Sequence, residues 1–454
     1  MLGAEIRDVH HGFRHRQVSG SDIGARVAGA HLPVSRPVVY AASAGCERGG
    51  ATTGRERSAM MTSRRETPAR RRAAIAGLGL TELGKVYGPS ARQFAAQAVR
   101  RAAADAGIGL SDIDGLLVSA GTTPGVDLSL QVDLGLRDLR LLTQMQAFGS
   151  TAGAMVQYAA MAVEAGMADT VACVFADAPL KEGKATGAAY GGRRTTPTGW
   201  GSLLGSSGFA GPNSFYALAA RRHMKTYGTT SEQLGAIAVA QRAWAAKNPL
   251  AQLRDPITLA DHQASRFIAE PFHLLDCCLV SNGGAAVIVT SAERAKELAQ
   301  PAVQVLGWGQ AHPGNSFRRN DNLGLVSGAA QSGPAAMEMA GVTIEDIDVA
   351  EIYDCYTFTA LLTLEDYGFC GKGEGGEFVA TPGMLGPDGK LAVNTGGGQL
   401  SSYYLWGMTP LSEAIIQARG QGGERQVPKH DTVLVSGNGG ILDHHSTLVL
   451  GTEA

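Results

Sequence analysis

The hydrophobic pattern becomes regular at residue 73 and then alternates between strand-like and helix-like segments. The apolar run AAIAGLG (73–79) predicts a buried strand, and the next segment has apolar residues at Phe94, Ala98 and Ala102, the spacing of one helical face. Ser90 precedes that segment and is a residue type that caps helix N-termini. The pattern therefore predicts a strand and then a helix that begins after Ser90.

One phrase of the chain occurs twice. AGIGLSDIDGLLVSAG (106–121) returns as AGVTIEDIDVAEIYDC (340–355), so that an Ala-Gly pair and an Asp-Ile-Asp triplet fall on matching positions. A second pair of similar segments, 152–174 and 409–435, reads in each case as a helix followed by a buried strand. The chain therefore contains an internal repeat of two related halves.

Strands that alternate with helices favour parallel pairing, with helices covering the faces of the sheet. Two such halves are expected to pack as two sheets that share helices, with boundaries at 73–300 and 301–454. An insert at about 181–270, which includes the helical stretch 231–248, interrupts the first half. Insertions on a rigid scaffold often shape a substrate site, and a surface elaboration is the alternative.

The start of the chain has a different character. The first 59 residues hold eight Arg, no Lys, five acidic residues and four of the eleven His, without a sustained apolar period or a secretory apolar segment. We expect residues 1–72 to be a disordered extension. Because Met60 and Met61 precede the first regular strand, the working protein is expected to begin there as one alternative, and a targeting role is another.

Composition narrows the class of partner. A formal net charge of −2 gives no basic field for nucleic acid, and no apolar run approaches the roughly 18 residues that a bilayer span needs. Six cysteines in 454 residues form neither a disulfide framework nor a CxxC metal pair. These features favour a small-molecule substrate, a reducing cytoplasm and no metal.

Three segments in the last quarter carry the most specific chemistry: EIYDCYTFTALL (351–362), NTGGGQLSSYYLWG (394–407) and SGNGGILDHH (436–445). With other strings in the same order and spacing, they resemble the thiolase superfamily, specifically its lipid-transfer or sterol-carrier branch. Those strings are LKEGK, RRHMKTYGTTSEQL, NPLAQLRDP, EPFHLLDCCLVSNGGAAV, LEDYGFC and RGQGGERQV. The resemblance covers nearly all of 73–454 and implies an α/β thiolase-like fold, with two duplicated βαβαβαββ halves in a layered αβαβα arrangement.

The resemblance also shows what this chain lacks. Thiolases use a nucleophilic cysteine at the start of a buried helix, where the thiolate is stabilised by the helix N-terminus and a paired base. The matching stretch QAFGSTAGAM (146–155) has Gly149 or Phe148 at that position. The second catalytic cysteine is matched by Ser436, a far poorer acid or base. We therefore expect no covalent acyl-enzyme at this position.

Tyrosines occupy the positions of the two thiolase histidines. Tyr353 replaces the first, while Tyr403 and Tyr404 match the Gly and His of the second motif. A phenol donates a proton at neutral pH, or acts as a base where the site lowers its pKa of about 10. We expect Tyr353 and narrowly Tyr403 to be catalytic, supported by Tyr404, Asp354 and His445; aromatic packing is the alternative for one of the adjacent tyrosines.

A further set of residues is expected to bind the substrate or its CoA group. Clustered glycines let a backbone approach a ligand closely, and an arginine pair in the insert suits a phosphate. The expected positions are Gly149, Ser150, Arg193, Arg194, Gly397, Gly398, Gly439 and Gly440. Ordinary turns and an exposed loop are the alternatives, and no cofactor is expected besides the acyl-CoA substrate itself.

Without the nucleophile, the chemistry left to an acyl-CoA site is cleavage of the bond between the α and β carbons. The combination resembles the steroid side-chain-cleaving aldolases of actinobacterial sterol catabolism. This resemblance implies a lyase that cleaves 17-hydroxy-3-oxo-pregnene-20-carboxyl-CoA to androst-4-ene-3,17-dione and propionyl-CoA. It also implies a homodimer and a partner, the OB-fold acyl-CoA-associated domain of a steroid enoyl-CoA hydratase.

Two other functions stay open on the sequence alone. One is an acyltransferase or thiolase that uses Cys355, which predicts inactivation by iodoacetamide. The other is a non-catalytic carrier of lipid-CoA molecules, which predicts binding without products. Acid-base tyrosines at two separate positions favour the aldolase, because simple loss of function would more often leave small or apolar residues.

Overall fold

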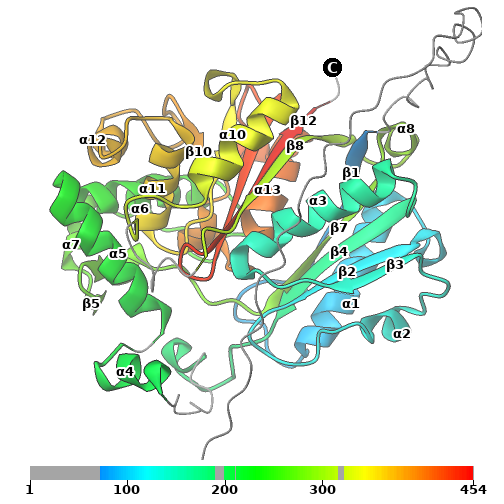
Figure 1. Cartoon of the computed structure of the whole chain (residues 1–454), viewed down its shortest axis with the longest axis horizontal. Coiled ribbons are helices and arrows are strands. Elements are labelled where there is room, and N and C mark those ends of the chain that lie inside the picture. The colour runs from blue at the N-terminus through cyan, green and yellow to red at the C-terminus, as the bar shows by residue number, and fades with distance from the viewer. Residues whose placement is uncertain (1–71, 190–198, 210, 315–321, 453–454) are drawn as a thin grey trace, which may run out of the picture. The chain divides into compact units, whose positions relative to one another are not determined.

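The computed structural model describes residues 72–189, 199–209, 211–314 and 322–452. Apart from Arg72, the expected disordered extension lies outside these ranges. Ten strands form one mixed sheet in the order β10-β9-β11-β12-β8-β1-β7-β4-β2-β3 (Figure 1). Their bounds are β1 Ala73–Leu80, β2 Gly115–Ala120, β3 Leu141–Gln144, β4 Thr170–Asp177, β7 Gly283–Ser291, β8 Val303–Ala311, β9 Val349–Glu351, β10 Ala392–Val393, β11 Thr432–Gly439 and β12 His444–Gly451.

The two halves of the sheet have the same pairing pattern. In the first half, β2 runs parallel to β3 and β4, and β7 is antiparallel to β4 and β1. In the second half, β9 runs parallel to β10 and β11, and β12 is antiparallel to β11 and β8. The predicted duplicated α/β fold is therefore confirmed.

The halves meet along the first strand of each. Ala74 pairs with Gln304 and Ile75 pairs with Val303, so β1 and β8 join the halves into one continuous sheet. The sequence pattern had predicted two separate sheets. The difference arises because each of these strands would otherwise be an edge with unpaired backbone groups, and a short antiparallel pairing satisfies some of them.

Helices cover the sheet in layers. The principal helices are α1 Ala91–Ala106, α3 Thr151–Glu164, α5 Pro212–Tyr227, α6 Ser231–Ala246, α10 Ala329–Ala340, α11 Thr357–Tyr367 and α13 Met408–Ala418. The helix α1 packs on one face of the first half, and α10 packs on one face of the second. Both α3 and α13 contact strands of both halves, which gives the αβαβα layering (Figure 1).

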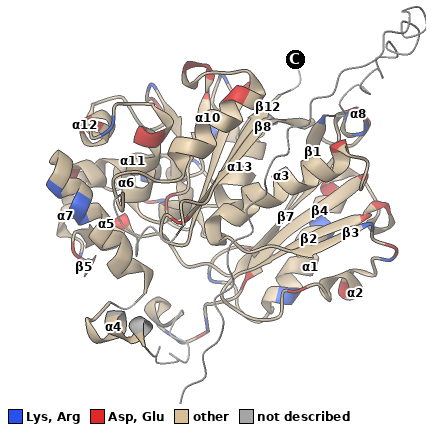
Figure 2. Ribbon diagram, in the orientation of Figure 1, with Lys and Arg blue, Asp and Glu red and all other residues tan. Residues whose placement is uncertain are grey.

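Shorter helices complete the described chain. They are α2 Leu130–Leu134, α4 Trp200–Ser206, α7 Leu259–Ala264, α8 Ala292–Ala295 and α12 Gly375–Ala380. The strands β5 Phe267–Ala269 and β6 Phe272–His273 form a separate two-stranded sheet. Figure 2 shows that Lys, Arg, Asp and Glu lie mainly on the outer helices and loops, while the central strands are almost free of them.

The repeated phrase has a clear structural role in both halves. Gly107 and Gly341 end α1 and α10 in the left-handed conformation, at φ 74° and 73°. The second aspartate of each Asp-Ile-Asp triplet then accepts a backbone hydrogen bond at the start of a neighbouring parallel strand: Asp114 from Thr170 at 2.8 Å, and Asp348 from Thr432 at 3.0 Å. The repeat therefore ends a helix and aligns two strands in each half.

The predicted helix starts agree with the structure. Ser90 caps α1 in a capping box with Gln93, and Thr230 caps α6 with Gln233. The helix α6 belongs to the insert and packs against α11 and α12 of the second half. The insert therefore lies over the half that carries the three C-terminal motifs. The division of the chain at residue 300 remains a prediction from the repeat.

Candidate active site

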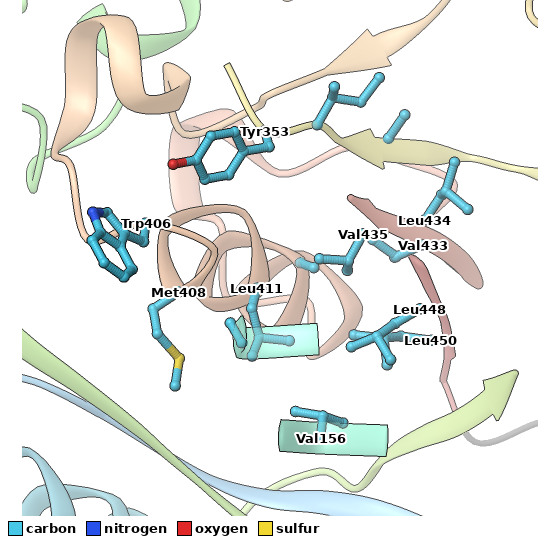
Figure 3. Close-up of a cluster of buried hydrophobic side chains, with 14 of the residues drawn as sticks. Val156, Tyr353, Trp406, Met408, Leu411, Val433, Leu434, Val435, Leu448 and Leu450 are labelled. Carbon is cyan, nitrogen blue, oxygen red and sulfur yellow. The ribbon is translucent and has the colours of Figure 1, made fainter. Parts of the chain in front are cut away.

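Tyr353 lies at the centre of the three C-terminal motifs. It follows β9, its side chain is 3% exposed, and its hydroxyl lies 3.2 Å from the hydroxyl of Tyr404. In Figure 3 the Tyr353 hydroxyl points toward the side of the apolar cluster on which Trp406 lies. Two phenols from two different motifs therefore share one hydrogen bond at the end of a parallel strand.

Gly149 lies directly beside the Tyr353 ring. A Cβ atom at this position would overlap the ring of Tyr353 and the carbonyl oxygen of Asn438. Gly149 lies in the short turn Phe148–Ser150 directly before α3, and the residue before it, Phe148, has a positive φ of 52°. The expected loss of a cysteine here has a steric reason, because Tyr353 occupies the space of the missing side chain.

Tyr403 and Tyr404 point in opposite directions. The backbone of Tyr403 is extended, with φ −156° and ψ 164°, so successive side chains alternate. Tyr404 is half-buried, and its backbone N–H donates to Ser281 Oγ at 3.0 Å. Tyr403 is fully buried, and its hydroxyl is bonded to Ser412 Oγ at 2.6 Å. The structure thus brings Tyr404 and not Tyr403 to Tyr353, while the expected catalytic role of Tyr403 stays a prediction.

Asp354 holds the glycine-rich segment in place. Its buried carboxylate accepts hydrogen bonds from the backbone of Gln399 at 2.9 Å and of Leu400 at 3.3 Å. These residues lie in the π-helical turn Gly398–Ser402, which leads directly into Tyr403 and Tyr404. Burial raises the pKa of Asp354 to about 7, although the backbone hydrogen bonds act in the opposite direction. Asp354 therefore positions the segment that delivers Tyr404.

His445 faces away from this pair. Its neighbour Ser446 donates to the carbonyl of Ser150 on the α3 side, so His445 points to the opposite face of β12. There its Nε2 lies 3.1 Å from Tyr367 Oη and 3.2 Å from Ser436 Oγ. Burial lowers the pKa of His445 to about 3, which keeps the ring neutral. The structure does not bring His445 to Tyr353, and its supporting role in catalysis stays a prediction.

Packing accounts for the glycines expected to bind the substrate. A Cβ at Gly397 would press on Ala245 of α6, one at Gly398 would overlap the Asp354 carboxylate, and one at Gly439 would overlap the carbonyl of Ala147. Gly440 has a φ of 63°, and the Ser150 hydroxyl is buried without a hydrogen-bond partner among the described residues. Ligand binding at these positions stays a prediction.

The expected phosphate-binding pair, Arg193 and Arg194, lies outside the described residues. Within the described ranges, His, Cys, Asp and Glu form no group of three or more that could hold a metal ion. None of the described helices is both long and apolar enough to cross a membrane.

Comparison with known proteins identifies the family. A family model for thiolase C-terminal domain-like sequences matches residues 309–452. A steroid side-chain-cleaving aldolase of Thermomonospora curvata is 38% identical over 391 residues, which cover 84% of this chain and 98% of that protein. The chain belongs to the thiolase superfamily.

Two further thiolase-superfamily proteins resemble the chain over the same extent. A 17-hydroxy-3-oxo-4-pregnene-20-carboxyl-CoA lyase of Mycobacterium tuberculosis is 36% identical, over 84% of this chain and 99% of that protein. The solved structure of an Ltp2-ChsH2(DUF35) aldolase is 36% identical with a TM-score of 0.74, over 84% of this chain and 98% of that chain. The matches span the two halves and the insert alike.

Tyr216 is a site residue of this thiolase-superfamily chain that the sequence reasoning missed. It lies on the buried face of α5, and its ring is 4.8 Å from the ring of Tyr356. Its hydroxyl oxygen accepts a hydrogen bond from Asn438 Nδ2 at 3.1 Å. A contact between residues so far apart in the chain has no local signal in the sequence.

Cys355 is a buried thiol in the same region. Burial raises its pKa to about 12, so the nucleophilic thiolate is scarce at neutral pH. Its sulfur lies 3.8 Å from Thr359 Oγ1, and Tyr216 also interacts with it. Cys355 is therefore a neutral neighbour of the phenols in this state of the protein.

The Tyr353 phenol is neutral as well. Burial raises the pKa of Tyr353 well above its usual value near 10, and the hydrogen bond with Tyr404 acts in the opposite direction. Burial disfavours the charged phenolate, so a proton that leaves Tyr353 has to be replaced. The arrangement is suited to passing a proton along the pair rather than to forming a stable phenolate.

Proposed function

We propose that this chain is a carbon-carbon lyase of the thiolase superfamily that cleaves a steroid β-hydroxyacyl-CoA by a retro-aldol reaction. The substrate is 17-hydroxy-3-oxo-pregnene-20-carboxyl-CoA, and the products are androst-4-ene-3,17-dione and propionyl-CoA. Relatives that are 38% and 36% identical over most of the chain are named for steroid side-chain cleavage and for lyase action on this compound. As the cysteine usage suggests, the reaction takes place in the cytoplasm.

The single observation that carries the mechanism is the Tyr353–Tyr404 pair beside Gly149. The phenol oxygens are 3.2 Å apart, and the Tyr353 ring fills the space of a nucleophilic side chain at position 149. This geometry supports proton transfer without a covalent acyl-enzyme. It also favours Tyr404 over Tyr403 for the second proton-transfer role.

The proton balance closes with both tyrosines neutral. The β-hydroxyl of the substrate gives its proton to the first phenol, which passes its own proton across the hydrogen bond to the second. As the bond between the α and β carbons breaks, the β carbon becomes a ketone, and the bonding electron pair takes up the proton that the second phenol releases to the α carbon in the same step. Neither phenol oxygen therefore holds two protons at any stage. No phenolate is needed, which agrees with the raised pKa of Tyr353.

The decisive experiment measures both products by mass spectrometry, with purified protein, the steroid CoA thioester and the hydratase-linked partner domain. Changing Tyr353→Phe or Tyr404→Phe removes one hydroxyl of the pair, so each is expected to lower kcat by about 100-fold or more. Tyr403→Phe is the matched control and is expected to stay within a few-fold of the wild type. Near-normal turnover in both Tyr353→Phe and Tyr404→Phe would sink the mechanism.

The assembly is part of the proposal. One similar solved structure is named for two components, Ltp2 and ChsH2(DUF35), which supports a partner domain for this chain as well. We expect that partner to be the OB-fold domain of a steroid enoyl-CoA hydratase, and the chain to form a homodimer. Light scattering is expected to give twice the mass of the 47.1 kDa chain alone and a larger mass with the partner. A monomer in both samples argues against the assembly.

The alternative of a Cys355-dependent acyltransferase has its own test. The raised pKa of the Cys355 thiol speaks against a nucleophile there. Iodoacetamide is therefore expected to leave the lyase activity unchanged, and mass spectrometry is expected to find no acylated Cys355. A carrier without catalysis would bind the steroid CoA thioester and release no propionyl-CoA.

A further inference from the structure

Tyr216, on helix α5 of the insert, is hydrogen-bonded to the end of β11. Its hydroxyl oxygen, which is buried with the rest of the side chain, accepts a hydrogen bond from Asn438 Nδ2 at 3.1 Å. Burial raises the pKa of Tyr216, while this bond and one from the backbone of Leu442 act in the opposite direction. One donor at the end of β11, Asn438, and one in the connection that follows, Leu442, thus converge on one phenol of α5.

The connection itself has an unusual backbone. Gly440, Ile441 and Leu442 are three consecutive residues in the left-handed region, with φ of 63°, 62° and 68°. Glycine accepts this conformation, but a β-branched or bulky side chain disfavours it. Such residues persist where the surroundings hold them, and they concentrate at functional sites.

The end of β11, directly before this connection, lies against Gly149 and so beside the proposed catalytic pair. The carbonyl of Asn438 lies against Gly149, and the ring of Tyr353 lies against Gly149 as well. A Cβ at Gly439 would overlap the carbonyl of Ala147, so the end of β11 packs tightly along this segment. A shift of the connection would therefore move the surface on which the Tyr353 ring rests.

We propose that Tyr216 is a positioning residue, whose phenol oxygen holds the left-handed segment 440–442 through Asn438 and Leu442 and thereby fixes the support of Tyr353. This role rests on the proposed function only for its kinetic effect. The hydroxyl of Tyr216, rather than its ring, is the essential group. The insert then takes part in catalysis by fixing the geometry of the second half.

The first test measures hydrogen exchange of the backbone amides of residues 440–443 in the full chain. Tyr216→Phe keeps the ring beside that of Tyr356 and removes only the oxygen, so exchange of these amides is expected to rise at least ten-fold. Asn438→Ala removes one of the two donors and is expected to give a smaller rise. Tyr356→Phe is the matched control: its hydroxyl bonds to Asn213 instead, and exchange at 440–443 is expected to match the wild type.

The second test is kinetic, with the steroid CoA thioester and the partner domain. Tyr216→Phe is expected to lower kcat by 10- to 100-fold with KM within about two-fold, because Tyr353 is misplaced for the transition state. Adding Ile441→Gly to Tyr216→Phe is expected to recover part of the lost kcat, because glycine accepts the left-handed conformation without the clamp. A purely structural role of Tyr216 would give no such rescue.

The two tests separate the possible failures. If the wild type releases no propionyl-CoA, the proposed function fails, and hydrogen exchange still decides whether the clamp exists. Unchanged exchange at 440–443 in Tyr216→Phe, or an equal rise in Tyr356→Phe, overturns the positioning role. Increased exchange with an unchanged kcat also overturns it, because loosening of residues 440–443 would then not affect the position of Tyr353.

Discussion

At the scale of single residues, the Tyr353 ring occupies the space that a side chain at position 149 would need. This explains why a glycine at 149 accompanies a large ring at 353. The contact is mutual, since any Cβ at 149 would overlap the ring. Tyr403 and Tyr404 show the same dependence on local geometry, because one extended residue turns one phenol to Ser412 and the next to Tyr353.

Restoring the thiolase cysteine is expected to damage this protein. Gly149→Cys forces the new side chain against the Tyr353 ring and the Asn438 carbonyl, and overpacking of this kind typically lowers the free energy of unfolding by about 1–3 kcal/mol. Chemical denaturation measures the change. Gly205→Ala, where a Cβ meets nothing within 4 Å, is the control and is expected to be neutral.

The same clash predicts coupling between the two positions. In a Gly149→Cys/Tyr353→Ala double variant the ring is gone, so the cysteine is expected to cost less than it does in the wild-type background. Additive losses would show that the overlap is relieved elsewhere.

The carboxyl of Asp354 predicts a pH dependence of stability. Its pKa is about 7 in the folded chain against about 4 unfolded, so the folded state holds the extra proton and the stabilisation from Asp354 is lost as pH rises. In urea unfolding, the stability of the wild type relative to Asp354→Asn is expected to fall by on the order of 2–3 kcal/mol between pH 5 and pH 8. A difference that is flat with pH, or one that rises, contradicts the raised pKa.

At the scale of elements, the repeated aspartates show how local sequence sets strand register. Asp114 accepts hydrogen bonds from the backbone of Asp169 and Thr170 at the start of β4, and Asp348 accepts one from Thr432 at the start of β11. Each sits after a helix ended by a left-handed glycine, so one short phrase both stops a helix and aligns two parallel strands. The repeated segment can be recognised in the sequence because the residues that end the helix and accept the hydrogen bonds lie within a few positions of one another.

Removing either aspartate is expected to weaken its own half. Asp114→Ala and Asp348→Ala each leave strand-initiating N–H groups without their charged acceptor, which lowers the free energy of unfolding by about 1.5–3 kcal/mol. Denaturant titration checks both. Asp388→Ala, at an exposed loop position, is expected to change stability by less than about 0.5 kcal/mol. Equal effects at all three positions would remove the special role of the repeat.

At the scale of the whole described structure, the two halves share their central helices. Both α3 and α13 contact strands of both halves, and β1 pairs with β8. Neither half therefore covers its own sheet alone, and the buried face of each depends on the other. The insert adds to this dependence, because α6 of the first half packs on α11 and α12 of the second.

The halves are accordingly expected to unfold together. In hydrogen exchange under increasing urea, the slowest amides of β4 and β7 and those of β11 and β12 should merge into one cooperative opening with the same free energy. The helices α1 and α10, which each cover one half, serve as references within the same experiment. Two openings at clearly different urea concentrations would contradict a shared core.

The sequence by itself determined the order of elements, the duplication and the absence of a nucleophilic cysteine at position 149. Each of these depends on apolar periodicity, helix caps or short motifs, which involve residues close together in the chain. It also placed Tyr353 and Asp354 among the residues expected at the site. Only the tertiary structure decided that Tyr404 meets Tyr353, that His445 turns to Tyr367, and that Tyr216 meets Asn438. Those outcomes depend on the direction of a side chain at one residue, or on a contact across 222 positions, and neither leaves a periodic signal in the sequence.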